Sequence, residues 1–424
     1  MPIQKPDSGF KPHRQKRCRA ALLMLLTFCG LGYAAVPVRT GLDVLIEQRF
    51  KPLRGKRVGL ITNHTAVDRH GRSIVEAFAS CPAVKVVALF APEHGLTGGR
   101  EAGESLPSQI DPATGAPVYS LYGSTNKPTA EMLQGIEVLV FDIQDVGARF
   151  YTYISTLFLA MEAAAEAHIA FMVLDRPNPS GGLILEGPVL KKEHQSFVGI
   201  RPIALRHGMT IAELASLFNG EKWLADGRQV ALSVIKMKGW QRKFFFQDTG
   251  LPWINPSPNI RSPQTTWLYP GMCLLEATNL SEGRGTYRPF EWIGAPWIDA
   301  DTVCAHFSRD TSVIRITPVQ FTPVQIPGTA SRPKYQDRVC HGLELTVLKP
   351  DQFLAVPFSL QLLALLRQLY PDSLQFNLAG MNRLSGDELI GQGLRDGLGG
   401  EALWQAVQPP MKAFRKTRQK YLLY

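Results

Sequence analysis

Five short apolar runs, each rich in β-branched residues, restrict the folds open to this chain. They cover residues 57–62, 84–91, 117–121, 138–143 and 170–175. Unbroken apolar runs of this length are typical of strands buried on both faces, as in a parallel sheet. Helical patterns lie between or after them, at residues 151–168 and again after a capping-box pair, Thr210 and Glu213. This alternation predicts an α/β fold with a doubly wound parallel sheet.

A change of composition near Trp253 predicts a second domain. Residues 251–270 contain five prolines, and the later strand candidates at 313–318 and 343–349 stand apart from one another. Residues 357–370 and 408–421 have amphipathic helical patterns. We therefore expect a first domain at residues 36–255 and a smaller α+β domain at residues 256–424.

The first 35 residues have the pattern of a secretory signal. Six basic residues and one acid precede an uncharged apolar stretch at residues 20–35, which ends in Tyr-Ala-Ala. This stretch is shorter than the roughly 20 residues that a membrane span needs, and Phe28 disfavours lipid attachment at Cys29. We expect a cleaved signal and export to the periplasm or the extracellular space, with membrane contact only through this segment.

The net charge of +10 does not predict a nucleic-acid partner. The predicted signal carries half of this excess, and the other half lies in the basic residues between 412 and 420, so the rest of the chain is neutral. Phosphate binding needs basic residues clustered on the folded domain. A solvated helix face is the simpler interpretation of the basic C-terminal stretch.

Polar side chains follow four of the predicted strands, where ligands bind in open α/β sheets. The first two strands run into Asn63-His64 and Glu93-His94, and the last runs into Arg176 and Asn178. The fourth ends in a longer polar segment that holds Asp142, Gln144, Asp145, Arg149, Tyr151 and Tyr153. Together these groups favour a site for a polar, hydroxyl-rich ligand, and of the two tyrosines we expect only one to face it.

The same segments resemble a known family. The matching motifs are N-H-T at 63–65, F-A-P-E-H-G at 90–95, F-D-I-Q-D-V-G-A-R-F-Y-T-Y at 141–153, L-D-R-P-N-P at 174–179 and E-A-T-N-L-S-E-G-R-G-T at 276–286. They are similar to those of bacterial exo-β-N-acetylmuramidases of the NamZ type. The resemblance implies a Rossmann-like first domain, a smaller second domain and an active site in the cleft between them. It also implies release of N-acetylmuramic acid from the non-reducing ends of peptidoglycan fragments, without a cofactor.

Glycoside hydrolysis needs an acid for the leaving oxygen and usually a second carboxylate. Glu93 is our candidate acid, because it ends a strand beside apolar Phe90, Ala91 and Pro92, which favour the protonated form. Glu282 and Asp142 are candidates for the second group, although either could instead serve in an ion pair or a loop contact. The substrate's own 2-acetamido group is a third route.

Muramic acid carries a lactyl carboxylate, which calls for a fixed cation. Arginine binds a carboxylate with two parallel hydrogen bonds. Arg284, between two glycines, is the first candidate, and Arg149 and Arg176 follow it. Salt bridges to nearby acids are the alternative role of these arginines.

Two other functions fit parts of the sequence. A non-catalytic muropeptide-binding protein could use the same cleft, but would not need the carboxylate of Glu93. A metal-dependent cell-wall amidase or deacetylase could use His64, His94, Glu93 and Asp142, yet no H-E-x-x-H or comparable spacing supports a metal site. No G-x-G-x-x-G motif follows the first strand, so a dinucleotide is not expected either.

Overall fold

The computed structural model describes residues 37–98, 109–307 and 312–424, so the predicted export signal lies outside the described residues. Residues 36–424 form one compact unit. Within the described ranges, no helix combines the length and the apolar character that a membrane crossing requires.

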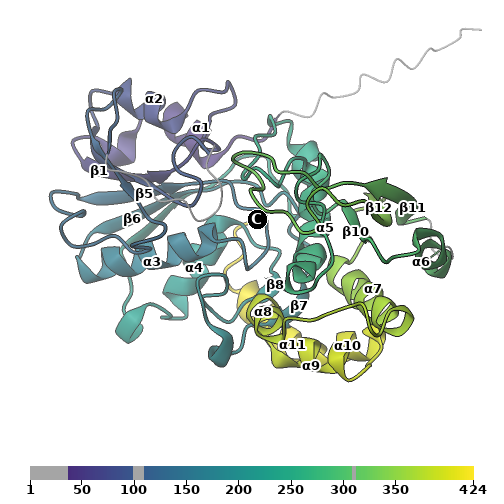
Figure 1. The fold of residues 1–424 in the computed structure, drawn as a ribbon. Helices are drawn as coiled ribbons and strands as arrows, with labels where there is room; N and C mark the ends of the chain where they lie inside the picture. Colours follow the sequence, from purple (N-terminus) through teal and green to yellow (C-terminus); the bar gives the residue numbers. More distant parts are fainter. Residues whose placement is uncertain (1–36, 99–108, 308–311) are drawn as a thin grey trace, which may run out of the picture. The chain divides into compact units, whose positions relative to one another are not determined.

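A mostly parallel seven-stranded sheet forms the first part of this unit (Figure 1). Its strand order is β3-β4-β2-β1-β5-β6-β9, and only β3 runs antiparallel to its neighbour. The strands are β1 (Arg57–Thr62), β2 (Lys85–Ala91), β3 (Gln109–Ile110), β4 (Pro117–Ser120), β5 (Val138–Asp142), β6 (Ala170–Leu174) and β9 (Leu232–Ile235). Because β1 is central and the chain turns first to one side and then to the other, the ligand-binding crevice of such sheets falls beside the carboxyl end of β1.

Helices cover both faces of the sheet, as the unbroken apolar runs predict. Leu60, Val140 and Met172 share a buried cluster with α1 (Gly41–Glu47) and α2 (Ile74–Ala79). The alternate positions, including Phe141 and Val173, pack with α3 (Tyr153–Glu166) and α4 (Ile211–Gly220). The predicted capping box is present, with the Thr210 side chain accepting from the backbone N–H of Glu213.

The C-terminal part contains a separate three-stranded antiparallel sheet in the order β10-β12-β11. Its strands are β10 (Trp292–Ala295), β11 (Ile314–Phe321) and β12 (Cys340–Val347). The helices of this part are α5 (Pro263–Met272), α6 (Ala300–Phe307), α7 (Ala355–Leu369), α8 (Leu378–Ser385), α9 (Glu388–Arg395), α10 (Gly400–Ala406) and α11 (Gln408–Gln419), with a 3₁₀ turn, η5 (Cys273–Ala277). The fold class is therefore the predicted one, a doubly wound sheet followed by a smaller α+β part.

A hairpin and one arginine join the two parts. The hairpin consists of β7 (Glu186–Val189) and β8 (Ala204–Arg206), and β7 contacts α7 and α11. The side chain of Arg149 is buried, and its guanidinium donates to the carbonyls of Pro188 and Ile203 on the hairpin and of Leu384 and Ser385 at the end of α8. Burial lowers the pKa of Arg149 to about 9.

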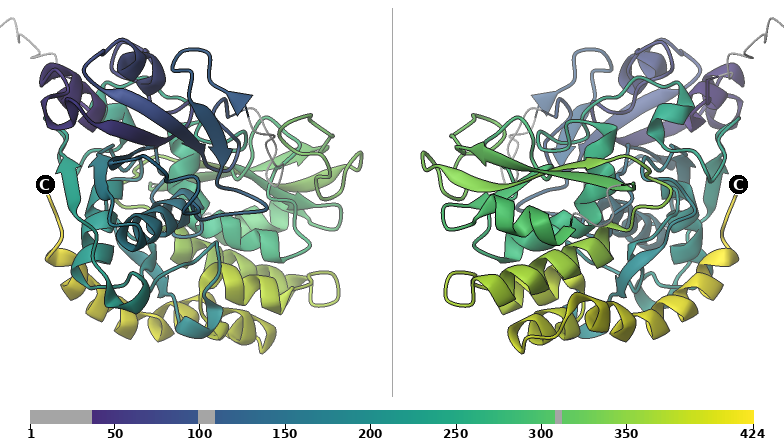
Figure 2. Two further views of the ribbon diagram at one scale, coloured as in Figure 1. Left: turned by 90° about the vertical axis from the view of Figure 1, so that its left-hand side faces the viewer. Right: turned by 90° about the vertical axis from the view of Figure 1, so that its right-hand side faces the viewer.

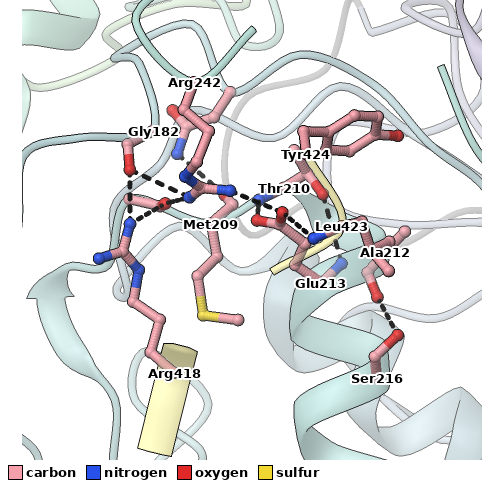
Figure 3. Close-up of polar contacts among 12 residues, drawn as sticks. Gly182, Met209, Thr210, Ala212, Glu213, Ser216, Arg242, Arg418, Leu423 and Tyr424 are labelled. Atoms are coloured by element: carbon pink, nitrogen blue, oxygen red, sulfur yellow. Dashed lines mark hydrogen bonds and ion pairs between the residues drawn. The ribbon is translucent and has the colours of Figure 1, made fainter. Parts of the chain in front are cut away.

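The end of α11 and the chain after it return to the first sheet (Figures 2 and 3). Arg418 donates to the carbonyls of Gly182 and Gly208, and the backbone N–H of Leu423 donates to Glu213, which also pairs with Arg242 at 2.7 Å. The hydroxyl of Tyr424 donates to Asp175, just after β6, at 2.7 Å. Burial raises the pKa of Asp175 to about 7, although the hydrogen bond from Tyr424 opposes this rise.

We predict that Tyr424→Phe destabilises the fold, and more at high pH than at low pH. The ring still packs against Trp240, but the buried Asp175 loses a donor, at a cost of about 1.5–3 kcal/mol when the carboxylate is charged. Without that donor the folded-state pKa of Asp175 rises further above the ordinary aspartate value of 3.8. The added penalty is therefore absent well below pH 7, where Asp175 is protonated in both folded proteins, and complete above the higher folded-state pKa of the variant.

Urea unfolding at pH 5 and pH 9, with each variant compared with wild type, checks this prediction. Tyr421→Phe is the matched control, because it removes a 2.7 Å hydrogen bond to Glu221, whose side chain is 25% exposed. We expect the control to lose less than about 1 kcal/mol. Equal losses in the two variants at both pH values would refute the role given to Asp175.

Candidate functional site

A cavity of about 200 Å³ brings together side chains from both parts of the unit. Glu93 and Glu276 are the two acids among its described lining residues, and Arg284 is its arginine. Its other polar lining residues are His94, Tyr122, Tyr151, Thr152, Tyr153, Ser257, Asn259, Tyr269, Cys273 and Thr329. We call this space the Glu93 cavity.

Glu93 lies in the turn that follows β2 and is partly exposed. The hydroxyl of Thr152 donates to its Oε2 atom at 2.6 Å. Thr152 is the N-cap residue of α3 but makes no side-chain bond to its own helix, so its hydroxyl is used to hold Glu93. Burial and the neighbouring Glu93 raise the pKa of Tyr122 to about 12, so Tyr122 presents a neutral hydroxyl beside the carboxyl group.

The C-terminal part contributes a cluster of charged side chains around η5. Arg284 donates to Glu276 at 2.7 Å and lies 3.4 Å from Glu282, which also binds Lys334 at 3.0 Å. Burial opposes ionisation of Arg284, but Glu276 and Glu282 raise the pKa of its guanidinium, which stays cationic. The side chain of Glu276 is 30% exposed and lines the cavity, whereas Glu282 is 5% exposed and lies behind it.

The guanidinium of Arg284 is fixed but retains a free edge. It lies over the ring of Phe290, with its central carbon 5.3 Å from the ring centroid. Its Nε and Nη2 atoms face the two glutamates, and Nη1 has no hydrogen-bond partner among the described residues. Gly283 and Gly285 on either side have φ angles of 79° and 80°, which a residue with a side chain rarely adopts.

Two other predicted site residues are paired with each other, outside the lining of the Glu93 cavity. The guanidinium of Arg176 binds both carboxylate oxygens of Asp142, and its Nη2 also donates to the carbonyl of Val67 at 3.0 Å. The side chains of Asp142 and Arg176 are 0% and 5% exposed. They join the end of β5 to the loop after β6, which is the salt-bridge role that the sequence left open for Arg176.

Arg149 and several amide side chains also hold loops together. Arg149 makes the carbonyl contacts described above. Gln144 donates to the carbonyls of Asp145 and Pro177, and Asn178 donates to that of Met209. Asp145 accepts from the backbone of Gly147 at 2.7 Å. These residues hold together the loops at the carboxyl ends of the strands, but they do not line the Glu93 cavity.

Asn63 contacts a residue of the cavity wall. Its Nδ2 atom donates to the hydroxyl of Tyr153, which in turn donates to the carbonyl of Pro256. Tyr151 and Tyr153 both line the cavity, with ring centroids 4.8 Å apart in an edge-to-face arrangement. The expectation that only one would do so was wrong, because Tyr151 precedes α3 and helical spacing does not apply to it.

Several cavity residues were not among the sequence candidates. Glu276 is the most important of them, and it opens the E-A-T-N motif from which only Glu282 and Arg284 were selected. Thr152 and Tyr122 were also missed. His64 borders a neighbouring groove, and its Nε2 atom lies 2.8 Å from the carbonyl of Asn255. In residues 37–98, 109–307 and 312–424, no three His, Cys, Asp or Glu side chains are grouped so that they could hold a metal ion.

Comparison with known proteins gives a consistent result over nearly the whole chain. Family models described as exo-β-N-acetylmuramidase NamZ, N-terminal and C-terminal, match residues 58–264 and 267–424. The peptidoglycan β-N-acetylmuramidase NamZ of Bacillus subtilis (strain 168) is 46% identical over 389 residues, covering 91% of each chain.

Two crystal structures of DUF1343 family proteins from Bacteroides fragilis are also similar. They have TM-scores of 0.84 and 0.77 and identities of 37% and 31%, and each match covers 92% of this chain and 99% of the other. The Glu93 cavity takes Glu93 from the segment matched by the first family model and Glu276 from that matched by the second.

Proposed function

This chain belongs to the NamZ family of exo-β-N-acetylmuramidases, and we propose that it hydrolyses peptidoglycan fragments in the Glu93 cavity. It is a glycosidase, and the product is N-acetylmuramic acid released from the non-reducing end. The observation that supports this location is the pair Glu93 and Glu276, two carboxyl groups lining one cavity with tyrosines and an arginine. Most glycosidases use two carboxyl groups that flank the scissile bond.

We assign the general acid to Glu93. It is partly exposed, so it exchanges protons with solvent between turnovers, and Thr152 fixes its orientation at 2.6 Å. Its proton passes to the oxygen of the leaving sugar as the glycosidic bond breaks.

We assign the second carboxylate to Glu276 rather than to Glu282 or Asp142. Arg284 holds Glu276 at the cavity wall, whereas Glu282 is bound from two sides by Arg284 and Lys334. Asp142 is fully buried against Arg176. Glu276 either attacks the anomeric carbon, activates a water or orients the 2-acetamido group of the substrate. The first two routes differ in the separation of the carboxyl groups, about 5–5.5 Å for direct attack and about 6.5–9.5 Å when a water lies between.

Hydrolysis of a 4-nitrophenyl glycoside of N-acetylmuramic acid tests the proposal. We expect release of nitrophenol together with free N-acetylmuramic acid, identified by mass spectrometry. Saturable binding of the glycoside without release of either product would instead support a muropeptide-binding protein.

Arg284 is our candidate for recognition of the lactyl carboxylate, because of the three arginines considered it alone lines the cavity. We predict that Arg284→Ala lowers kcat/KM on muramic acid glycosides about tenfold to a hundredfold more than on glucosamine glycosides, since a charge-assisted hydrogen bond contributes about 1.5–3 kcal/mol. Arg284→Lys should recover little, because an ammonium group lacks the planar fork. Equal losses on the two sugars would mean that Arg284 only positions Glu276.

We also propose that the protein works outside the cytoplasm. The basic and apolar pattern of residues 1–35 supports export, and peptidoglycan is located there. Determining the N-terminus of the mature protein tests this proposal: a start near Val36 supports export, and an intact leader on a cytoplasmic protein refutes it.

A further inference from the structure

A second groove adjoins the Glu93 cavity and has no role in the mechanism above. It has a volume of about 550 Å³ and shares Ser257, Pro258 and Thr329 with the cavity. Its remaining walls include His64, Trp253 and Arg261. We call this space the outer groove.

The walls of the outer groove carry chemistry that suits a saccharide with an acidic substituent. The indole of Trp253 is fixed, because its Nε1 donates to Asn255 at 3.0 Å and its ring meets that of Phe246 edge to face at 4.8 Å. Aromatic rings held in this way pack well against the apolar faces of other rings. Among the described lining residues there is no acid, and Arg261 is the single permanent cation.

Arg261 is available to an anionic ligand. Its guanidinium lies over the ring of Tyr287 at 5.7 Å, and no acidic side chain of the described chain lies within ion-pair distance of it. Tyr287 itself is 82% exposed, so the pair is at the surface of the groove. The neighbouring Glu93 cavity is different, because there Arg284 already faces two carboxylates.

The direction of the glycan in exo-hydrolysis relates the Glu93 cavity to the outer groove. The terminal sugar occupies the cavity, and the rest of the glycan must leave beside the group that protonates the leaving oxygen. Glu93 and His94 line the cavity, and the cavity meets the outer groove along the shared wall of Ser257, Pro258 and Thr329.

From this continuity we infer that the outer groove binds the leaving-group side of the glycan. Trp253 packs against the sugar that follows the scissile bond, and Arg261 pairs with a carboxylate of the muramyl unit beyond it, from its lactyl group or its stem peptide. This inference rests on the proposed function and identifies residues that determine substrate length.

Three substrates separate the contributions of the two residues: the nitrophenyl glycoside of N-acetylmuramic acid, a muramyl-glucosamine disaccharide and the corresponding tetrasaccharide. For Trp253→Ala we expect kcat/KM to fall about threefold to tenfold on both saccharides and to stay within about twofold of wild type on the nitrophenyl glycoside. For Arg261→Gln we expect a loss of about threefold to fivefold on the tetrasaccharide alone, shrinking in about 0.5 M salt as the charge is screened.

Two further variants control for loss of packing and for loss of a positive charge elsewhere on the surface. Trp253→Phe keeps a ring against Phe246 and should retain part of the activity on saccharides, and Arg395→Gln removes an exposed arginine of α9, outside the outer groove. Equal losses on all three substrates, or no loss on any, would overturn the inference. No turnover of any substrate by the wild-type protein would instead contradict the proposed function.

Discussion

Glu93→Gln is expected to lower kcat on a natural muramyl-glucosamine disaccharide by about 10²–10⁴-fold, the usual cost of losing a general acid. Glutamine is nearly the same size and still accepts the hydrogen bond from Thr152, so the fold and substrate binding should persist. The loss should be smaller on the nitrophenyl glycoside, because nitrophenolate leaves with little need of a proton.

Steady-state kinetics on both substrates check this result, with the melting temperature measured in parallel. Glu131→Gln is the matched control, since Glu131 is exposed and does not line the Glu93 cavity. A near wild-type rate on the disaccharide would remove Glu93 from the acid role. An equal loss on both substrates would indicate that it acts on the sugar rather than on the leaving group.

The second large effect is expected for Glu276→Gln, which should lower kcat at least about 10²-fold on both substrates while the protein remains folded. The partly exposed position of Glu276 allows the fold to tolerate the change. Asp142→Asn should act differently, because it breaks a buried ion pair with Arg176 and so costs about 3–5 kcal/mol of stability. Glu282→Gln should lower both kcat and the stability of the fold, since it leaves Lys334 and Arg284 each short of a partner.

Urea unfolding and kcat for these three variants rank the candidates. If Asp142→Asn is stable but inactive while Glu276→Gln keeps its activity, the assignment of the second carboxylate is wrong. The comparison is informative because all three changes convert a carboxylate into an amide of the same shape.

The sheet could be predicted because its strands are buried on both faces. Residues 57–62 form β1 as expected, and the predicted edges of β2, β5 and β6 differ from the observed ones by one residue each. β9 was missed because Leu232–Ile235 is a short edge strand with only partly buried side chains, so it lacks an unbroken apolar run.

The polar residues at the carboxyl ends of the strands could be predicted from the sequence, but the directions in which their side chains point were harder to predict. Asp142 shares its strand face with Val138 and Val140, which pack on the side of α1 and α2, whereas α3 carries the cavity residues Tyr153 and Thr152 on the other face. The two-residue period of a strand therefore contained the signal that Asp142 points away from the cavity. The sequence had no comparable signal for Arg149, because its partners Leu384 and Ser385 lie more than two hundred residues away.

Glu276 was missed for a related reason. It lies in the short 3₁₀ turn η5, where neither helical nor strand periodicity indicates which side chain faces a ligand. Its position depends on Arg284 and on the backbone around it, which Lys334 contacts through the carbonyls of Leu275 and Glu276. Such contacts are set by the tertiary fold.

The central claim is that N-acetylmuramic acid is released in the Glu93 cavity, and a crystal structure of Glu93→Gln with a muramyl-glucosamine disaccharide tests it most directly. We predict that the muramyl ring fills the cavity, with the glycosidic oxygen about 2.6–3.2 Å from the side chain of residue 93. The lactyl carboxylate should then contact Arg284, and the glucosamine should point toward Trp253. A disaccharide bound elsewhere, or one whose glycosidic oxygen faces away from residue 93, would contradict the account.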